Sequence, residues 1–135
     1  MKKAFVIVSL ALVLFVYLFL SFHKNSDKLE DSSWQLSDWT LNCSIVAPIT
    51  LNFEGNEISG NGGVNSYSGE YEINGEEFII SNLVSTEMAS LEPDINNAES
   101  GYFSALSEVR YYELSDSDLS LLNNNKEVVL IYEKK

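Results

Sequence analysis

The residues whose types and spacing could best bind a ligand lie in a glycine- and asparagine-rich segment from Gly60 to Gly69. Glycines of this kind can cradle a phosphate group when a helix follows them and basic residues stand nearby. Here a strand-like segment follows, and no Lys or Arg occurs between Lys28 and Arg110. The alternative is a tight turn, in which glycines adopt positive φ and asparagine side chains bond to nearby backbone. The pattern favours this turn over a phosphate site.

Side chains that commonly carry catalysis are scarce in this chain. The only histidine is His23, so the remaining chain lacks the commonest general base and the commonest zinc ligand. Ser-His-Asp and Cys-His arrangements are excluded after this position. Asp116 and Asp118 lack the further ligands of a calcium loop, and no spacing selects two of the many carboxylates as an acid pair. The sequence therefore predicts no catalytic residue, no cofactor and no metal site.

The charge of the chain is strongly one-sided. From Trp34 to Lys135 there are 17 Asp and Glu against four Lys and Arg, a net charge near −13. Such a charge repels nucleic acid and anionic lipid and favours basic partners or simple solubility. The sequence predicts no nucleic-acid partner and leaves open an acidic surface that attracts a basic protein.

Residues 4–22 are 19 consecutive residues without a charge, close to the roughly 20 apolar residues that a helix needs to cross a bilayer. Lys2 and Lys3 precede them and favour a cytoplasmic N-terminus with the rest of the chain outside. A cleaved signal peptide has a shorter apolar region and a small-x-small site, which the following SFHKNS does not offer. The pattern favours a single-pass anchor in the inner (cytoplasmic) membrane. A secreted or periplasmic protein after cleavage, and a buried core helix, are the alternatives.

The chain is predicted to have three parts: residues 1–22 as membrane anchor or signal peptide, residues 23–33 as polar linker, and residues 34–135 as one folded domain. Cys43 is the single cysteine and can close no disulfide within the chain. About 100 residues can fold on a hydrophobic core alone, so the domain needs no such bridge.

Residues 34–135 mostly alternate apolar and polar side chains between turn signals, the pattern of β-strands. Asn74-Gly75 is a hairpin signal, because both residues tolerate positive φ. After Pro93 the apolar residues recur at spacings of three and four, as on one face of a helix. Gly101 inside this helix weakens it by about 1 kcal/mol relative to Ala, and a close contact with the sheet would explain it. The helical face consists of Ile95, Ala98, Tyr102, Leu106 and Val109.

The predicted order is thus five strands, one helix and three strands. It indicates an α+β domain, in which a curved antiparallel sheet of about seven to eight strands packs on one helix. A transmembrane helix precedes this domain. Tyr111 and Tyr112 are adjacent on a predicted strand, so their rings point to opposite faces and one of them can serve a binding surface.

Three motifs resemble those of the META domain family, which includes bacterial heat-inducible proteins of the HslJ type. They are G-N-G-G-x-N-x-Y-x-G-x-Y from Gly60 to Tyr71, S-T-x-M-A from Ser85 to Ala89, and E-x-x-Y-F-x-A-L-x-x-V from Glu99 to Val109. The resemblance covers nearly all of residues 34–132. The motif residues, for which the sequence favours a structural role, are Gly60, Asn61, Gly62, Gly63, Asn65, Tyr67, Gly69, Tyr71, Ser85, Thr86, Met88 and Ala89.

This resemblance implies a small antiparallel sheet with a helix, exported or tethered to a bacterial membrane and loosely linked to envelope stress, with no known catalytic site. Many members carry cysteines at the positions of Val64 and Ser90, and the absence of both here is consistent with a chain that does not rely on that bridge. Met88 is expected to fill core space and Thr86 to bond to backbone.

Three functions remain in competition at this point. The first is a non-enzymatic, membrane-tethered envelope protein that binds an exported or envelope protein under stress. The second is an acidic inhibitor or sequestering module for a basic exported protein. The third is a carboxylate-based hydrolase, which is the weakest because no acid pair stands out. The oligomeric state and the partner are not specified by the sequence.

The mature protein is expected to keep residues 1–33 and to fractionate with membranes, because no small-x-small site follows the apolar segment. The intact mass of the membrane-extracted protein measures this. A mass that corresponds to loss of the first ~20–25 residues would show that the segment is a signal peptide.

Overall fold

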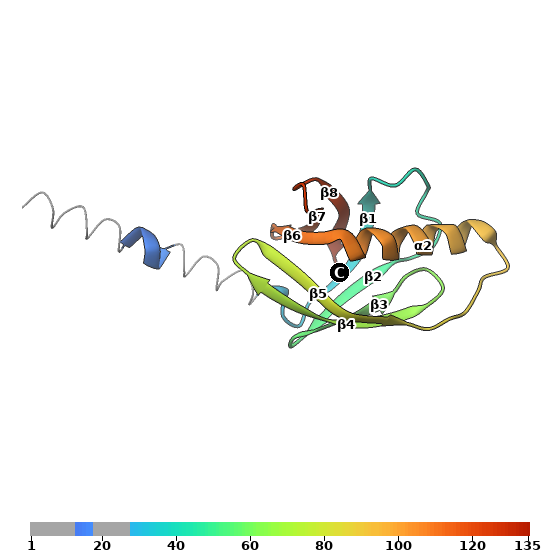
Figure 1. The fold of residues 1–135 in the computed structure, drawn as a ribbon, viewed down its shortest axis with the longest axis horizontal. Coiled ribbons are helices and arrows are strands. Elements are labelled where there is room, and N and C mark those ends of the chain that lie inside the picture. Colours follow the sequence, from blue (N-terminus) through green and yellow to red (C-terminus); the bar gives the residue numbers. More distant parts are fainter. Residues whose placement is uncertain (1–12, 18–27) are drawn as a thin grey trace, which may run out of the picture.

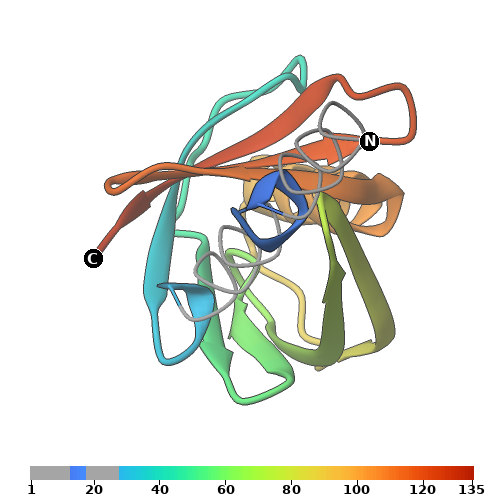
Figure 2. The same ribbon diagram turned by 90° about the vertical axis from the view of Figure 1, so that its left-hand side faces the viewer.

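The computed structural model describes residues 13–17 and 28–135, and the alternating segments form eight antiparallel strands. Each strand pairs with the next, and the last pairs with the first, so the sheet closes into a barrel (Figures 1 and 2). The predicted order of five strands, one helix and three strands is confirmed, as is the curved antiparallel sheet. The elements are β1 (Ser33–Trp39), β2 (Thr50–Glu54), β3 (Glu57–Asn61), β4 (Ser66–Asn74), β5 (Glu77–Ser85), α2 (Pro93–Glu108), β6 (Val109–Leu114), β7 (Asp118–Asn123) and β8 (Val128–Lys134).

The helix α2 lies across one end of the barrel (Figure 1). Tyr102 of the helix bonds to Tyr67 near the start of β4, and the C-terminal half of α2 faces the end of β1 and the start of β8. Because neighbouring strands run in opposite directions, these strand ends belong to the same end of the barrel. At the opposite end lies Leu29, fully buried just before β1. The barrel is therefore covered at both ends.

Large side chains fill the inside of the barrel. A barrel of eight strands is just wide enough for its inward-facing side chains to occupy the interior. The alternation on β1 and β2 places Trp34, Leu36, Leu51 and Phe53 inside, all less than 5% exposed. The core cluster also includes Phe78. The interior is a packed core.

Three tyrosine hydroxyls form a chain through this core. The hydroxyl of Tyr102 lies 2.7 Å from that of Tyr67 and 3.0 Å from that of Tyr132. The Tyr67 hydroxyl also donates to the carbonyl of Thr50 at 2.7 Å. Burial raises the pKa of Tyr67, Tyr102 and Tyr132 well above the usual tyrosine value. These hydrogen bonds between neutral hydroxyl groups therefore join α2 to the strands β2, β4 and β8.

The predicted hairpin turn is displaced by one residue. Asn74 and Glu77 pair across β4 and β5, so the two-residue loop is Gly75-Glu76 rather than Asn74-Gly75. Gly75 has φ 66°, whereas neither Asn74 nor Glu76 has positive φ. Positive φ at the first central residue alone is the pattern of a type II′ turn, so the glycine defines the turn and the asparagine ends a strand.

Gly101 contacts a loop and not the sheet. A Cβ atom at this position would lie 3.0 Å from Cδ1 of Leu41, in the connection that follows β1. The predicted close contact therefore exists, but its partner is a flexible side chain.

The predicted membrane segment, residues 4–22, lies outside the described residues except for residues 13–17, which are helical. Within residues 13–17 and 28–135, no helix is long and apolar enough to cross a membrane. The folded domain begins before Trp34, because Leu29 and Ser32, placed by the sequence in the linker, are buried.

The free energy of unfolding is expected to fall steeply above about pH 10. Below that pH the tyrosines are neutral in both states. Above it the unfolded chain loses tyrosine protons that the buried hydroxyls keep, because their pKa values are raised in the folded state. Each such tyrosine contributes about 1.4 kcal/mol per pH unit to this loss. Urea titrations between pH 8 and 12 measure the slope.

The variant Tyr102→Phe should make this slope shallower by about 1.4 kcal/mol per pH unit, the contribution of one tyrosine, because it removes one of the buried titrating groups. An identical slope for parent and variant would show that Tyr102 ionises equally in the folded and unfolded states.

Candidate functional site

The glycine-rich segment forms the loop that joins β3 to β4. Asn61 accepts a hydrogen bond at its Oδ1 from the backbone N–H of Gly63 at 2.8 Å. The N–H of Gly62 donates to the carbonyl of Asn65, also at 2.8 Å. The loop is thus closed by its own asparagine, as expected of a structural turn.

Two glycines of this loop are required by its shape. Gly63 has φ 124°, a conformation that L-residues rarely adopt. A Cβ at Gly62 would lie 2.8 Å from the ring of Phe103 and 3.0 Å from Oε1 of Glu99. The loop therefore lies directly against α2, and only glycine allows that approach.

The carboxylate of Glu99, on the inner face of α2, holds the loop. It is 7% exposed, and its Oε1 accepts the backbone N–H groups of Val64 at 3.0 Å and Asn65 at 2.6 Å. Its Oε2 accepts the side-chain Nδ2 of Asn65 at 2.6 Å. Three N–H donors around one carboxylate compensate for the cost of burying it.

Asn65 links this carboxylate to the connection between β5 and α2. Its Oδ1 accepts the hydroxyl of Thr86 and the backbone N–H of Met88, both at 2.7 Å. Its Nδ2 donates to the carbonyl of Met88 at 2.9 Å as well as to Glu99. The side-chain amide thus uses both donors and both acceptor positions. This amide has no free hydrogen-bonding group for a ligand.

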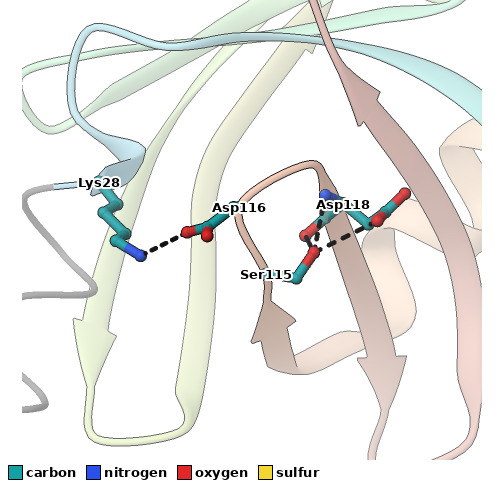
Figure 3. Close-up of polar contacts among 4 residues, drawn as sticks. All are labelled: Lys28, Ser115, Asp116 and Asp118. Carbon is teal, nitrogen blue, oxygen red and sulfur yellow. Dashed lines mark hydrogen bonds and ion pairs between the residues drawn. The ribbon is translucent and has the colours of Figure 1, made fainter.

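Asp116 and Asp118 both have polar side-chain partners at the turn between β6 and β7. Asp116 makes an ion pair with Lys28, whose Nζ lies 2.9 Å from Oδ1 (Figure 3). Asp118 accepts from the hydroxyls of Ser115 and Ser117 within the same turn. Lys28 lowers the pKa of the exposed Asp116 carboxyl. Among the described residues no group of three or more His, Cys, Asp or Glu could hold a metal ion.

A groove of about 470 Å³ lies between the C-terminal half of α2 and the strands β7 and β8. Leu41, Ala105 and Val129 give it an apolar floor, and Glu108 and Asn123 line it as polar residues. Nearby, Nη1 of Arg110 donates to backbone carbonyls of Ser107 and Val109. Thr40, Ser104 and Glu127 also line the groove.

A model of one protein family matches this chain. The META domain model covers residues 27–135, four-fifths of the chain. The chain belongs to the META domain family.

Solved structures also resemble this META domain. The NMR structure of a protein from Burkholderia xenovorans is 25% identical, with a TM-score of 0.66 over 79% of this chain and 83% of that one. A second NMR structure is 24% identical, with a TM-score of 0.60 over 79% and 92% of the two chains. A DUF4847 family protein from Bacteroides vulgatus is 12% identical, with a TM-score of 0.60 over 78% and 93%. The last two likenesses show the fold alone. No curated protein sequence matches the chain.

The structure brings parts of all three META motifs together at the end of the barrel covered by α2. The loop from Gly60 to Asn65, Thr86 with Met88, and Glu99 meet at this point. Other motif residues lie elsewhere. Tyr67 belongs to the hydroxyl chain, the Tyr71 hydroxyl donates to a turn carbonyl at 3.0 Å, Gly69 lies within β4, Ser85 ends β5, and Ala89 is exposed.

The expectation that Met88 fills core space is wrong. Its side chain is 60% exposed, and only its backbone takes part, through the two bonds to Asn65. The expectation that the Thr86 side chain bonds to backbone is also wrong, because its hydroxyl donates to the side-chain oxygen of Asn65. Only the backbone N–H of Thr86 reaches main chain, at the carbonyl of Ser66. The S-T-x-M-A motif therefore fixes the path of the chain through the Thr86 hydroxyl and the backbone groups of Thr86 and Met88.

Glu99 opens the third motif, but the sequence did not reveal its role as a buried acceptor of the loop's N–H groups. It lies three residues before Tyr102 and four after Ile95, on the apolar face of the helix. An acidic residue on such a face needs buried partners. The acidic residue on the apolar face was thus the sequence signal for a buried, hydrogen-bonded carboxylate. Its partners could not be identified from the sequence, because they come from a loop more than 30 residues away.

The loop is expected to determine stability. Asn65→Ala removes four side-chain hydrogen bonds and leaves part of the Glu99 carboxylate without a donor. We expect the free energy of unfolding to fall by about 2–4 kcal/mol. Gly63→Ala should lower it by about 1 kcal/mol or more, because of its positive φ. Urea unfolding measures both.

Asn52→Ala is the matched control, since the Asn52 side chain makes one long hydrogen bond, of 3.3 Å, to the carbonyl of Ser59. We expect the free energy of unfolding of this variant to fall by less than about 1 kcal/mol. If Asn65→Ala and Gly63→Ala unfold at the same urea concentration as the parent, the loop is not needed for stability and a binding role is indicated instead.

Proposed function

We propose that this META domain is a non-enzymatic binding module of the bacterial envelope, tethered to the cytoplasmic membrane by residues 4–22. In this proposal it supports envelope integrity under stress by holding an exported or envelope protein. The observation that carries the proposal is the filled barrel. Its interior is occupied by core side chains, and the polar groups of the motif loop are bonded to one another. Binding is therefore assigned to the outer surface.

The position of Lys28 supports the tethered arrangement. Its ion pair with Asp116 lies at the turn between β6 and β7, at the end of the barrel opposite α2. A chain that leaves the membrane after residue 22 would enter the domain at this end. The helix and the motif loop would then face away from the bilayer, where a partner can reach the surface around them.

The surface charge suits a protein partner. Residues 34–135 carry a net charge near −13, which raises the rate of encounter with a basic protein. The same observation favours the second candidate, an acidic module that sequesters a basic exported protein. The buried carboxylate of Glu99 accepts three N–H groups of the fold, so its oxygens are occupied by structural hydrogen bonds.

Cross-linking and pull-down from the membrane fraction test the proposal. We expect a specific envelope protein to be recovered with the full chain at both low and high salt. A variant in which an unrelated cleavable signal peptide replaces residues 4–22 should lose most of this partner, because the domain is no longer held at the membrane.

Recovery of a basic protein only at low salt would favour the sequestering module, since salt screens charge attraction between exposed groups. Recovery of no protein above the level of an unrelated tethered domain would contradict both.

A further inference from the structure

The groove beside the C-terminal end of α2 combines an apolar floor with two carboxylates. Its volume of about 470 Å³ is in the range of sites that bind small ligands or single side chains. The helix contributes Ser104 and Glu108, which are four residues apart and therefore project from the same side of α2. The turn between β7 and β8 contributes Asn123 and Glu127. Carboxylates from two separate elements thus line one groove.

Neither carboxylate has a cationic partner in the part of the chain that the structure describes. The two ion pairs there lie elsewhere, and no residue that lines the groove is basic. Arg110 follows Glu108 closely in sequence, but its Nη1 donates to two main-chain carbonyls of its own segment. Glu127 accepts one hydrogen bond, from Nδ2 of Asn123 at 2.9 Å. The groove therefore presents negative charge that the described fold does not neutralise.

The position of Glu108 is unfavourable for the helix itself. It is the last residue of α2, and the last turn contains no basic residue. A helix carries partial negative charge at its C-terminus, where a cation is stabilising and an acidic side chain is not. Such a local conflict with stability is common where a residue serves binding. A cation in the groove would be attracted by both carboxylates and by the end of the helix.

From these observations we propose that the groove binds an arginine side chain from an extended segment of a partner protein. Arginine matches both parts of the groove, because its aliphatic stem can lie on apolar surface while its guanidinium group remains at the polar rim. The planar guanidinium donates two parallel hydrogen bonds to one carboxylate and retains further N–H groups for a second. It thus joins Glu108 to Glu127 across the groove.

A polypeptide suits the groove better than a metal ion. Calcium takes about six to eight oxygen ligands, whereas two carboxylates line the groove and an apolar floor offers a metal nothing. Thr40 and Ser104, both exposed, add hydroxyl groups that can bond to the main chain of a bound segment. The groove lies at the end of the barrel covered by α2 (Figure 1), which in the proposed tethered arrangement faces away from the bilayer. The inference rests on the proposed role in partner binding, and it names the surface and the side chain recognised.

The probe is a capped peptide of sequence Gly-Ala-Val-Arg-Val-Ala-Gly, added to the full chain in detergent. We expect chemical-shift changes at the methyl groups of Leu41, Ala105 and Val128, which line the groove. A peptide with citrulline, a neutral isostere of arginine, should bind about tenfold more weakly, because two charge pairs are lost. A peptide with lysine should bind about threefold more weakly, since an ammonium group cannot donate as a planar fork.

Glu108→Gln and Glu127→Gln test each carboxylate at nearly constant shape. Each should weaken binding of the arginine peptide about threefold, and the double variant about tenfold, as expected of exposed charge pairs. Glu108→Gln should melt at no lower temperature than the parent, because it removes an acidic group from the helix C-terminus. Its weaker binding could then not be attributed to unfolding.

Glu113→Gln is the matched control. It removes the same charge from an exposed position of β6, which pairs with Ser120 and lies toward the other end of the strand. It should weaken binding less than about 1.5-fold, because salt screens distant exposed charges. Ser104→Trp leaves the charge unchanged but fills the groove from an exposed helix position, and it should abolish the shifts of the groove methyl groups.

Equal binding of the arginine and citrulline peptides, or equal effects of Glu108→Gln and Glu113→Gln, would overturn the inference, since the groove would then recognise no specific cation. Chemical-shift changes confined to another surface would do the same. If Ser104→Trp still recovers the cross-linked envelope partner, the inference fails while the proposed function stands. If no envelope partner is recovered but the groove distinguishes arginine from citrulline, the proposed function fails and the specificity of the groove stands.

Discussion

The end of the barrel that α2 covers depends on the hydrogen bonds to the buried carboxylate of Glu99. An ionised carboxylate away from water is unfavourable by several kcal/mol unless donors surround it. Here the donors are two backbone N–H groups of the β3–β4 loop and the side chain of Asn65. The loop can offer them only in one conformation, which requires glycine at Gly62 and Gly63. One charge thus specifies both the loop and the position of the helix over it.

The same contact compensates for the weak junction between β5 and β6. The insertion of α2 leaves these strands joined at a single residue pair, so the barrel lacks most of one ladder of backbone hydrogen bonds. Asn65 fastens the chain that leaves β5 through Thr86 and Met88, and Glu99 fastens the helix that leads into β6. The tyrosine hydroxyls add a second link, from α2 to β4 and β8. Side-chain bonds thus hold the segments on both sides of this junction.

Much of the fold follows from local pattern, and the remainder depends on contacts between distant residues. Alternation predicted the strands, and the change of period after Pro93 predicted the helix, because each pattern reports one buried face. Closure of the barrel needs β1 to pair with β8, nearly 100 residues later, and no local signal marks that pairing. For the site, glycine and asparagine predicted a structural turn. The role of Glu99 was missed because its partners are far away in sequence. Met88 was misjudged because its backbone, and not its side chain, makes the contacts.

The arrangement of the motifs bears on where function can reside in this family. The residues that identify the META domain here are those whose polar groups are already bonded within the fold, Asn65 and Glu99 above all. A group that has used its hydrogen-bonding capacity internally cannot also recognise a ligand without breaking those bonds. The motifs therefore report how the barrel is closed. The proposed partner contacts are therefore assigned to exposed residues outside the motifs, whose polar groups and apolar side chains are not used in closing the barrel.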